Sequence, residues 1–406
     1  MVCWPARRAR RTFVWTAPLL LVATLVTGCE QDSYPADLRY PARTDVLVID
    51  KPKEDVPETY GGYDRPGDFP GVILAGLPED AKKSLILDPA NLSDKQHTDL
   101  EGELSNRFGT PANPTADIGD TEVAAMLKLD PETLKRGSAI YRQQCLHCHG
   151  LSGDGRGATA PWVNPHPRDY RQGVFKFTSS SQNEGERKPR RYDLLRTLRE
   201  GIEGTSMPSF RLLPEEDLEA LASYVIHLSM RGEIEFSMIK NYLKDEGNSF
   251  SDYLGAIVSR WKAAQSSMIN PPAYPGDSLS GEAREKYLKD SIERGFKIFS
   301  LAQPQGNIKS GGCLGCHADF GRRAAYKYDT WGTIVRPADV TTGMYRGGRR
   351  PLDLYWRVHS GINGVTMPAS ISTLSPEEVW DVVNFLQVLP YPKMREKYGI
   401  RLEQSK

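Results

Sequence analysis

A five-residue motif, Cys-x-x-Cys-His, occurs twice in this chain of 406 residues and limits what the chain can fold around. Two intervening residues place both thiols on one side of a tight helical turn, and the histidine follows directly. The pattern is typical of c-type haem attachment, in which the thiols hold the haem covalently and the histidine binds its iron. A redox disulfide or half of a zinc site would explain one copy, but two copies that both end in histidine predict two haem c groups. The motif residues are Cys145, Cys148 and His149, and then Cys313, Cys316 and His317.

A longer pattern repeats around the two motifs, at an interval of about 160 residues. Before each motif stands Gly-x-x-Ile-aromatic, on an expected helix. After each motif come Pro-x-Asp, then Gly-Ile-x-Gly-x-x-Met-Pro, and then an amphipathic helix near 214–228 or 375–389. Ser375 and Glu378 form a capping box at the start of the later helix. The repeated single residues include Gly137 and Gly295 before the motifs, and Met207 and Met367 after them.

This order of elements resembles the class I c-type cytochrome domain, which has a first helix with a small glycine, the attachment motif, loops, a Met-Pro loop and a last helix. The resemblance covers about 130–230 and 284–392, roughly half of the chain. It implies a mainly α fold with two class I cytochrome c domains in tandem, at 126–230 and 284–392. A helical linker would occupy 231–283, and a C-terminal tail 393–406. As a whole, the chain is similar to bacterial dihaem cytochrome c lipoproteins.

In the family that the chain resembles, a methionine thioether closes the face of the iron opposite the histidine. A thioether is a soft ligand that favours reduced iron. Loop methionines often only fill a core, but Met207 and Met367 share one matched context, whereas Met344 has no counterpart in the first copy and is expected in the core. The implied iron ligands are His149 and Met207 in the first copy, and His317 and Met367 in the second.

The other histidines and a group of arginines have less specific interpretations. His147 is the variable position inside its own motif and is expected at the surface. His166 and His359 lie in loops that could approach a haem edge, although a hydrogen-bonded surface position is the simpler expectation; His227 and His97 suggest no function. The arginines after the second motif fit equally well a basic docking face for an acidic redox partner or pairing with haem propionates. They are Arg322, Arg323, Arg336, Arg346, Arg349 and Arg350.

The N-terminus predicts a lipoprotein signal peptide over 1–28. Four arginines precede an apolar stretch over 13–26, which is too short for a comfortable transmembrane helix of about 20 residues. Cys29 follows Val-Thr-Gly in a sequence that resembles a bacterial lipobox. We therefore expect cleavage before Cys29 and lipidation of its thiol, with an ordinary signal peptide or an uncleaved anchor as the alternative. Each interpretation places the remaining chain outside the cytoplasm, in the periplasm of a bacterium.

Residues 29–125 are acidic and rich in proline and glycine, with only short apolar pieces. We see no helical or strand period that persists through this stretch. It is therefore expected to be a tether or extension laid partly over the haem domains, with a small independent domain as the alternative.

The combined features favour a membrane-anchored dihaem electron carrier that is not itself an enzyme. The resemblance implies respiratory partners, such as a terminal oxidase or a quinol-oxidising complex. The formal net charge is zero, which disfavours a nucleic-acid partner. A dihaem peroxidase or sulfur-compound dehydrogenase is the alternative, but it would need one iron with an open or labile distal position. A haem-based sensor or scaffold ranks last, because the sequence contains no recognisable signalling domain.

Overall fold

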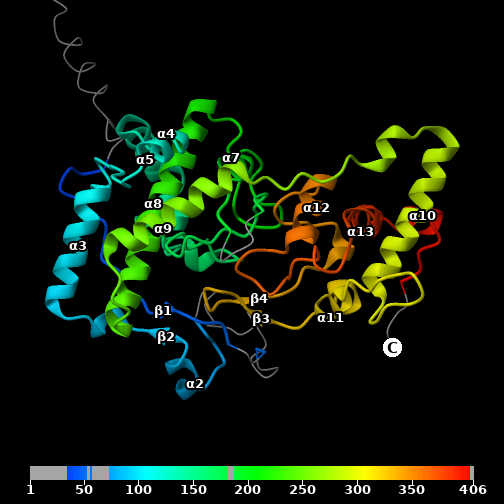
Figure 1. Ribbon diagram of the computed structural model, residues 1–406, viewed down its shortest axis with the longest axis horizontal. Helices are drawn as coiled ribbons and strands as arrows, with labels where there is room; N and C mark the ends of the chain where they lie inside the picture. The colour runs from blue at the N-terminus through cyan, green and yellow to red at the C-terminus, as the bar shows by residue number, and fades with distance from the viewer. Residues whose placement is uncertain (1–33, 53–54, 57–72, 182–186, 403–406) are drawn as a thin grey trace, which may run out of the picture.

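The computed structural model describes residues 34–52, 55–56, 73–181 and 187–402. Within these ranges the chain is mainly helical, with two short antiparallel two-stranded sheets. Figure 1 shows the helices up to α9 gathered at one end of the molecule and those from α10 onward at the other. The predicted signal peptide, Cys29 and residues 403–406 lie outside the described residues.

The described helices and strands follow one another in this order. They are β1 (Leu47–Val48), α2 (Glu79–Lys83), β2 (Ile86–Leu87), α3 (Asp94–Phe108), α4 (Thr121–Met126), α5 (Pro131–Gln144), α6 (Leu146–His149), α7 (Arg191–Glu200), α8 (Glu215–Lys244), α9 (Phe250–Ser266), α10 (Gly281–Ser300), α11 (Cys313–Cys316), β3 (Lys327–Tyr328), β4 (Ile334–Val335), α12 (Pro351–Ser360), α13 (Pro376–Val388) and α14 (Pro392–Lys397). Strand β1 pairs with β2, and β3 pairs with β4.

In the first half, α5 packs across α8, and a glycine sets how closely the two helices approach. A Cβ atom added at Gly137 would lie 2.2 Å from the backbone oxygen of Ala220, which is closer than real Cβ contacts allow. The start of α5 follows from local chemistry, because the Asp130 carboxylate accepts a hydrogen bond from the backbone N–H of Thr133 at 2.9 Å. The predicted first helix and its small glycine are confirmed.

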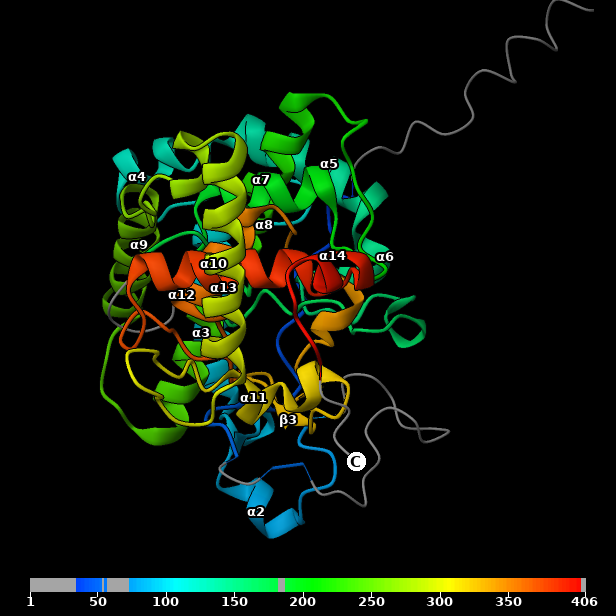
Figure 2. The same ribbon diagram turned by 90° about the vertical axis from the view of Figure 1, so that its right-hand side faces the viewer.

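The second half repeats this crossing with α10 and α13, which Figure 2 shows running steeply across each other. A Cβ atom added at Gly295 would lie 2.0 Å from the backbone oxygen of Asp381. The predicted capping box is present, because Ser375 and Glu378 each accept a hydrogen bond from the other's backbone N–H. The sequence repeat therefore appears in the structure as a repeated helix crossing.

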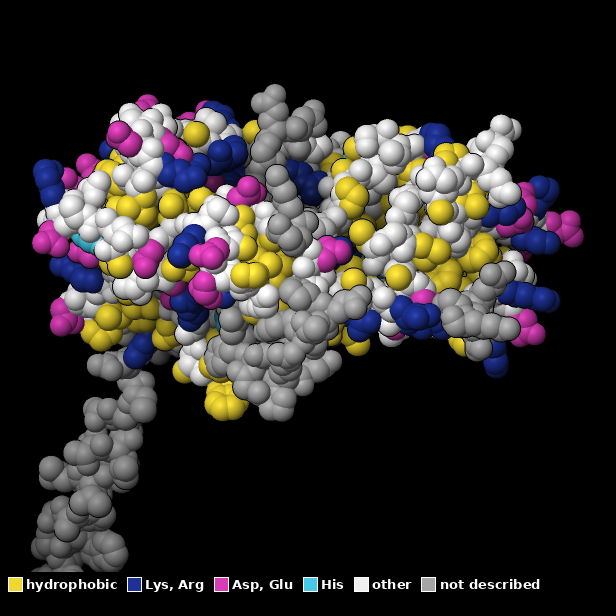
Figure 3. Space-filling view, turned by 90° about the horizontal axis from the view of Figure 1, so that it is seen from below, with side chains coloured by type: hydrophobic (Ala, Val, Ile, Leu, Met, Phe, Trp, Pro, Cys, Tyr) yellow, Lys and Arg dark blue, Asp and Glu magenta, His cyan; other side chains and the backbone are white. Residues whose placement is uncertain are grey.

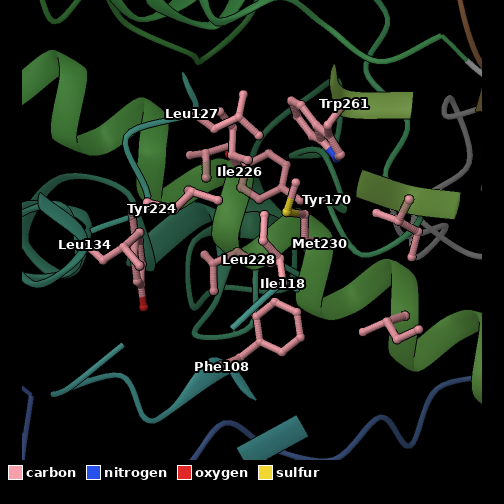
Figure 4. Packing of buried hydrophobic residues seen from close by; sticks show 14 of the residues in the cluster. Phe108, Ile118, Leu127, Leu134, Tyr170, Tyr224, Ile226, Leu228, Met230 and Trp261 are labelled. Atoms are coloured by element: carbon pink, nitrogen blue, oxygen red, sulfur yellow. The ribbon is translucent and has the colours of Figure 1, made fainter. Parts of the chain in front are cut away.

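Helix α8 does not end where the sequence repeat ends. It continues without a break to Lys244, so the predicted boundary at 230 falls inside a helix. Helix α9 returns along α8 and buries Trp261 in the same core as Met230 and Tyr224, as Figure 4 shows. The predicted helical linker is thus helical, but α8 and α9 belong to the core of the first half.

The N-terminal extension is more structured than we expected. A capping box at Ser93 and Gln96 begins the 15-residue helix α3, which packs on α8. Leu100, Leu104 and Phe108 are buried on one face of α3 and join the first core. The expectation that no helical period persists in this stretch is wrong, because these three residues are spaced four apart and form one apolar stripe.

The extension also contacts the second half of the chain. Leu74 is fully buried with Tyr328 and Ile334 in a small separate cluster. The backbone N–H of Leu74 donates to the oxygen of Gly332 at 2.7 Å, and the hydroxyl of Tyr328 donates to the oxygen of Ala75 at 2.6 Å. The extension therefore joins the two halves (Figure 1).

The described part of the stretch predicted as a C-terminal tail, residues 393–402, is also folded. Helix α14 occupies its start, and Tyr398 and Ile400 are buried in the core of the second half. Among the described residues, no helix is both long and apolar enough to cross a membrane.

Candidate haem sites

The first Cys-x-x-Cys-His motif lies where α5 ends and the single turn of α6 begins. The backbone N–H of His149 donates to the oxygen of Cys145 at 2.8 Å, which closes that turn. The hydroxyl of the buried Tyr141 donates to the oxygen of Gly150 at 2.9 Å and fixes the motif against α5. Cys145 and Cys148 are both free, so the two thiols are available for covalent attachment.

The His149 ring is held so that one nitrogen is engaged and the other is left for a metal. Its Nδ1 donates to the backbone oxygen of Arg168 at 3.2 Å, and its ring stacks on Tyr170 with centroids 4.8 Å apart. A histidine that binds a metal commonly donates its other N–H to a carbonyl in this way. Burial lowers the pKa of His149 to about 4, and this keeps the imidazole in the neutral form that binds iron.

A tight loop carries the methionine that the resemblance implies as the distal ligand. The backbone oxygen of Met207 accepts from the N–H of Ile202 at 3.1 Å, and its N–H donates to the hydroxyl of Thr205 at 3.1 Å. Gly201 has a φ of +69° and would place a Cβ atom 2.7 Å from the oxygen of Met207, so this turn requires glycine. Met207 is half-buried and packs against the first core.

The second motif has the same construction. Cys313 and Cys316 are free thiols on the single turn of α11. The Nδ1 of His317 donates to the backbone oxygen of Ala338 at 3.0 Å, and burial lowers the pKa of this histidine as well. Phe299 lies beside the ring, with centroids 6.1 Å apart.

The second Met-Pro loop repeats the turn of the first, although Val365 replaces Thr205, whose hydroxyl accepts from the methionine N–H in the first loop. The backbone oxygen of Met367 accepts from the N–H of Ile362 at 3.2 Å. Gly361 has a φ of +69°, and a Cβ atom there would lie 2.4 Å from the oxygen of Met367. Met367 is half-buried. The two halves therefore present the same set of groups: two thiols, one oriented imidazole and one loop thioether.

This donor set fits a covalently held haem better than it fits a bare metal ion. The thiols are paired on one turn, and each histidine keeps only one ring nitrogen free for an axial bond. Across the part of the chain that the structure describes, no three His, Cys, Asp or Glu side chains come together to hold a metal ion.

Most of the other histidines occupy ordinary positions. His147 is exposed, as predicted. His166 is half-buried with its Nδ1 3.1 Å from the oxygen of Pro167, and burial lowers its pKa. The Nδ1 of His359 lies 2.9 Å from the hydroxyl of Ser360. His227 is fully buried on α8, where its Nε2 donates to the oxygen of Phe108 at 3.0 Å and thereby links α8 to α3.

Met344 is not a core residue, so that expectation is wrong. Its side chain is 45% exposed, and its sulfur lies 2.1 Å from where a Cβ atom at Gly204 would stand. Met344, which belongs to the second half of the chain, therefore contacts the Met-Pro loop of the first half.

Several arginines after the second motif have partners within the chain. Arg322 pairs with Asp319, and Arg350 pairs with Asp353 at 2.9 Å. Arg336 donates to the oxygen of Ala324 at 2.9 Å. Figure 3 shows basic and acidic side chains interspersed over the face in view rather than separated into fields of one sign.

Sequence reasoning missed the groups that orient the two histidines. Arg168 and Ala338 act through their backbone oxygens, so their side chains give no chemical signal. The available signal was positional, because each is the middle residue of the repeated Pro-x-Asp. Trp331, which lies between the two halves, was also missed, because the first copy has a tryptophan in the corresponding loop, Trp162, and the sequence does not show that only Trp331 is buried.

Comparison with known proteins supports the first site. The family model "Cytochrome C oxidase, cbb3-type, subunit III" matches residues 132–225, which include the first motif and Met207. This region is therefore similar to a cytochrome c domain, and such a domain implies covalently bound haem c and a place outside the cytoplasm. No curated protein matches the chain.

Among solved structures, the chain is similar to the Kuenenia stuttgartiensis reducing HAO-like protein complex Kustc0457/Kustc0458, at 22% identity over 63% of this chain and 96% of that chain. The TM-score of 0.42 is too low to establish a shared fold.

Proposed function

We propose that this chain is a dihaem c-type cytochrome that carries single electrons between respiratory-chain partners outside the cytoplasm. The observation that supports this most strongly is the identical arrangement of the two histidines. Each follows two free thiols on one helical turn, and each donates its Nδ1 hydrogen to the middle carbonyl of a Pro-x-Asp segment, at 3.2 Å and 3.0 Å. The second site lies outside the matched cytochrome region, so its haem is part of the proposal.

The chain's own groups prepare each site for electron transfer with little rearrangement. The thiols would fix the haem covalently, and the carbonyls of Arg168 and Ala338 hold the imidazoles in one orientation. The thioethers of Met207 and Met367 would occupy the remaining axial positions. When bound, the haem supplies the one-electron chemistry. An iron closed on both faces has no position for a substrate, and for this reason we propose a carrier rather than an enzyme.

We also propose that Cys29 carries a lipid that anchors the chain to a membrane. The described chain begins at Tyr34, five residues after Cys29, so an anchor there would hold the haem domains close to the membrane surface. The partner would then be a membrane complex, such as a terminal oxidase or a quinol-oxidising complex. The natural chain should incorporate labelled fatty acid and Cys29→Ser should incorporate none, and a natural chain that incorporates none would contradict the lipid anchor.

Haem counting in cysteine variants tests the proposed function. The full chain should contain two haems per polypeptide, measured as the pyridine haemochrome against protein concentration. Replacing Cys313 and Cys316 by alanine should remove one haem, and replacing Cys145 and Cys148 should remove the other. A full chain with a single haem, unaffected by the change at 313 and 316, would contradict the dihaem proposal while leaving the first cytochrome domain intact.

A further inference from the structure

The two halves cover each other's Met-Pro loops in the same way. Gly204 and Gly364 occupy equivalent positions in these loops, and Val174 and Met344 each follow the glycine that comes after Pro-x-Asp. A Cβ atom at Gly364 would lie 2.9 Å from Val174, and one at Gly204 would lie 2.1 Å from the sulfur of Met344. Each loop that would supply a distal ligand therefore contacts the loop that follows the histidine-orienting segment of the other half.

Trp331 breaks this symmetry. It lies between β3 and β4, it is only 5% exposed, and its ring would be 2.7 Å from a Cβ atom at Gly364. The preceding residue, Thr330, donates its backbone N–H to the oxygen of Gly364 at 2.8 Å. The first half has a tryptophan in the corresponding loop, Trp162, but that side chain is 85% exposed.

The same indole also contacts the segment that orients the first histidine. The Nε1–H of Trp331 donates to the backbone oxygen of Asp169 at 3.1 Å. The guanidinium of Arg168 lies 3.6 Å from the centre of the ring. Arg168 is the residue whose backbone oxygen accepts from His149, so two hydrogen bonds and one residue of backbone connect His149 to the indole.

We propose that Trp331 is the bridge through which electrons pass between the two haems. This proposal rests on the dihaem function proposed above. The connected path runs from His149 through the backbone of Arg168 and Asp169, across the indole of Trp331, to the loop that holds Met367. In one transfer the iron of one site goes from ferrous to ferric and the iron of the other goes from ferric to ferrous. No covalent bond changes, and no proton moves.

The charges around Trp331 determine how it can act. Arg168 lies over the ring, and the Nζ of Lys176 lies 5.6 Å from the ring centre. Asp329 pairs with both of these groups, at 3.8 Å and 3.3 Å, and offsets part of their charge. The Arg168 guanidinium over the ring still opposes the positive charge that an oxidised indole would carry. Trp331 therefore serves as a medium for electron tunnelling and is not itself oxidised.

A buried carboxylate holds the bridge in place. Asp329 is fully buried, and its Oδ1 accepts the backbone N–H of Trp331 at 3.1 Å and the hydroxyl of Thr333 at 2.8 Å. Its Oδ2 pairs with Lys176 at 3.3 Å. Asp329 therefore holds the backbone of Trp331, and the Asp169 carbonyl holds its indole. Electron tunnelling through the ring requires such a fixed contact.

Flash-induced electron transfer in the full chain tests the bridge. Met207→His gives the first iron two imidazole ligands, which lowers its potential and separates its spectrum from that of the second iron. A photoactive ruthenium complex on Leu212→Cys, a position that is 95% exposed, then delivers an electron to the first site. The rate at which the second haem becomes reduced is compared among chains that carry the natural Trp331, Trp331→Leu or Trp331→Phe.

We expect Trp331→Leu to slow the internal transfer severalfold. Trp331→Phe keeps an aromatic ring beside Gly364 but loses the hydrogen bond to Asp169, so its rate should fall between the other two. Trp162→Leu is the matched control, and its rate should equal that of the parent. Haem content and the two potentials should be the same in all of these chains.

The possible failures can be told apart. A parent chain with one haem would overturn both the proposed function and the bridge. Two haems with equal internal rates in the parent, in Trp331→Leu and in Trp331→Phe would overturn the bridge alone and leave the dihaem function standing. Slowing by Trp162→Leu as large as that by Trp331→Leu would also overturn the bridge, because the effect would then not depend on the buried path.

Discussion

At the scale of single residues, backbone carbonyl oxygens orient the two histidines that would bind iron. His149 and His317 are both held by carbonyl oxygens, which remain in place whatever side chain stands at 168 or 338. This explains how an arginine in the first half and an alanine in the second can serve the same purpose. The side chain of Arg168 makes separate contacts, among them the one with Trp331.

Lys176 gives a pH-dependent prediction at this scale. Burial, together with the nearby charge of Arg168, lowers its pKa from 10.5 to about 7, although Asp329 opposes the shift. Below about pH 7 the lysine is charged in both the folded and the unfolded chain. Between about 7 and 10.5 the unfolded chain binds more protons, so stability rises with pH across that window.

The difference in unfolding free energy between the natural chain and Lys176→Met isolates this group. We expect the free energy of unfolding of the natural chain to rise relative to that of the variant as pH increases from about 7 to about 10. The slope should be at most about 1.4 kcal/mol per pH unit. Denaturant unfolding at several pH values measures the difference. A difference that stays constant over this range would contradict the lowered pKa.

At the scale of helices, the two crossings were predictable and the ends of the helices were not. The glycines at 137 and 295 stand at matching places before the motifs, and each allows one helix to touch another. The run of α8 past 230 was missed because the repeat stops there, although nothing in the sequence breaks the helix before Asp245, which has a φ of +52°. Helix α3 was missed because its acidic surface concealed a stripe of three apolar residues.

Glycine substitutions test the crossing in the second half. In Gly295→Ala, the new methyl group would meet the backbone of α13, so the helices must separate, and we expect a loss of about 1–3 kcal/mol in stability. Gly255→Ala is the matched control, since Gly255 is also in a helix but has nothing within 4 Å of an added Cβ atom. That control should gain about 0.5–1 kcal/mol, because alanine favours helix more than glycine does. Equal effects in thermal unfolding would show that α10 and α13 do not cross at Gly295.

At the scale of the whole molecule, the N-terminal extension and the turn around Trp331 connect the two halves that the sequence repeat predicts as separate domains. The repeat indicates two similar units but does not show which residues of each unit contact the other. Gly204 and Gly364 belong to the repeated pattern, whereas Leu74 lies in the extension outside it. All three lie at contacts between distant parts of the chain, and the sequence alone does not distinguish them from residues that make no such contact.

Leu74→Ala tests the contact between the extension and the second half. Leu74 is fully buried against Tyr328 and Ile334, so removing its side chain should cost about 2–5 kcal/mol in local stability. We expect faster amide hydrogen exchange in β3 and β4, with α5 unchanged. Leu212→Ala, at a position 95% exposed, is the control and should alter neither region. Unchanged exchange in β3 and β4 would mean that the extension does not hold the second half.

The central claim is that both irons are closed by methionine and act as electron carriers. The absorption spectrum of the oxidised full-length protein tests it most directly, through the sulfur-to-iron charge-transfer band at the red end of the visible range. We predict that both haems are low-spin, that Met207→His and Met367→His each remove half of this band, and that the double variant removes all of it. A high-spin iron that readily binds cyanide or peroxide in the natural chain would contradict the carrier and favour a dihaem enzyme.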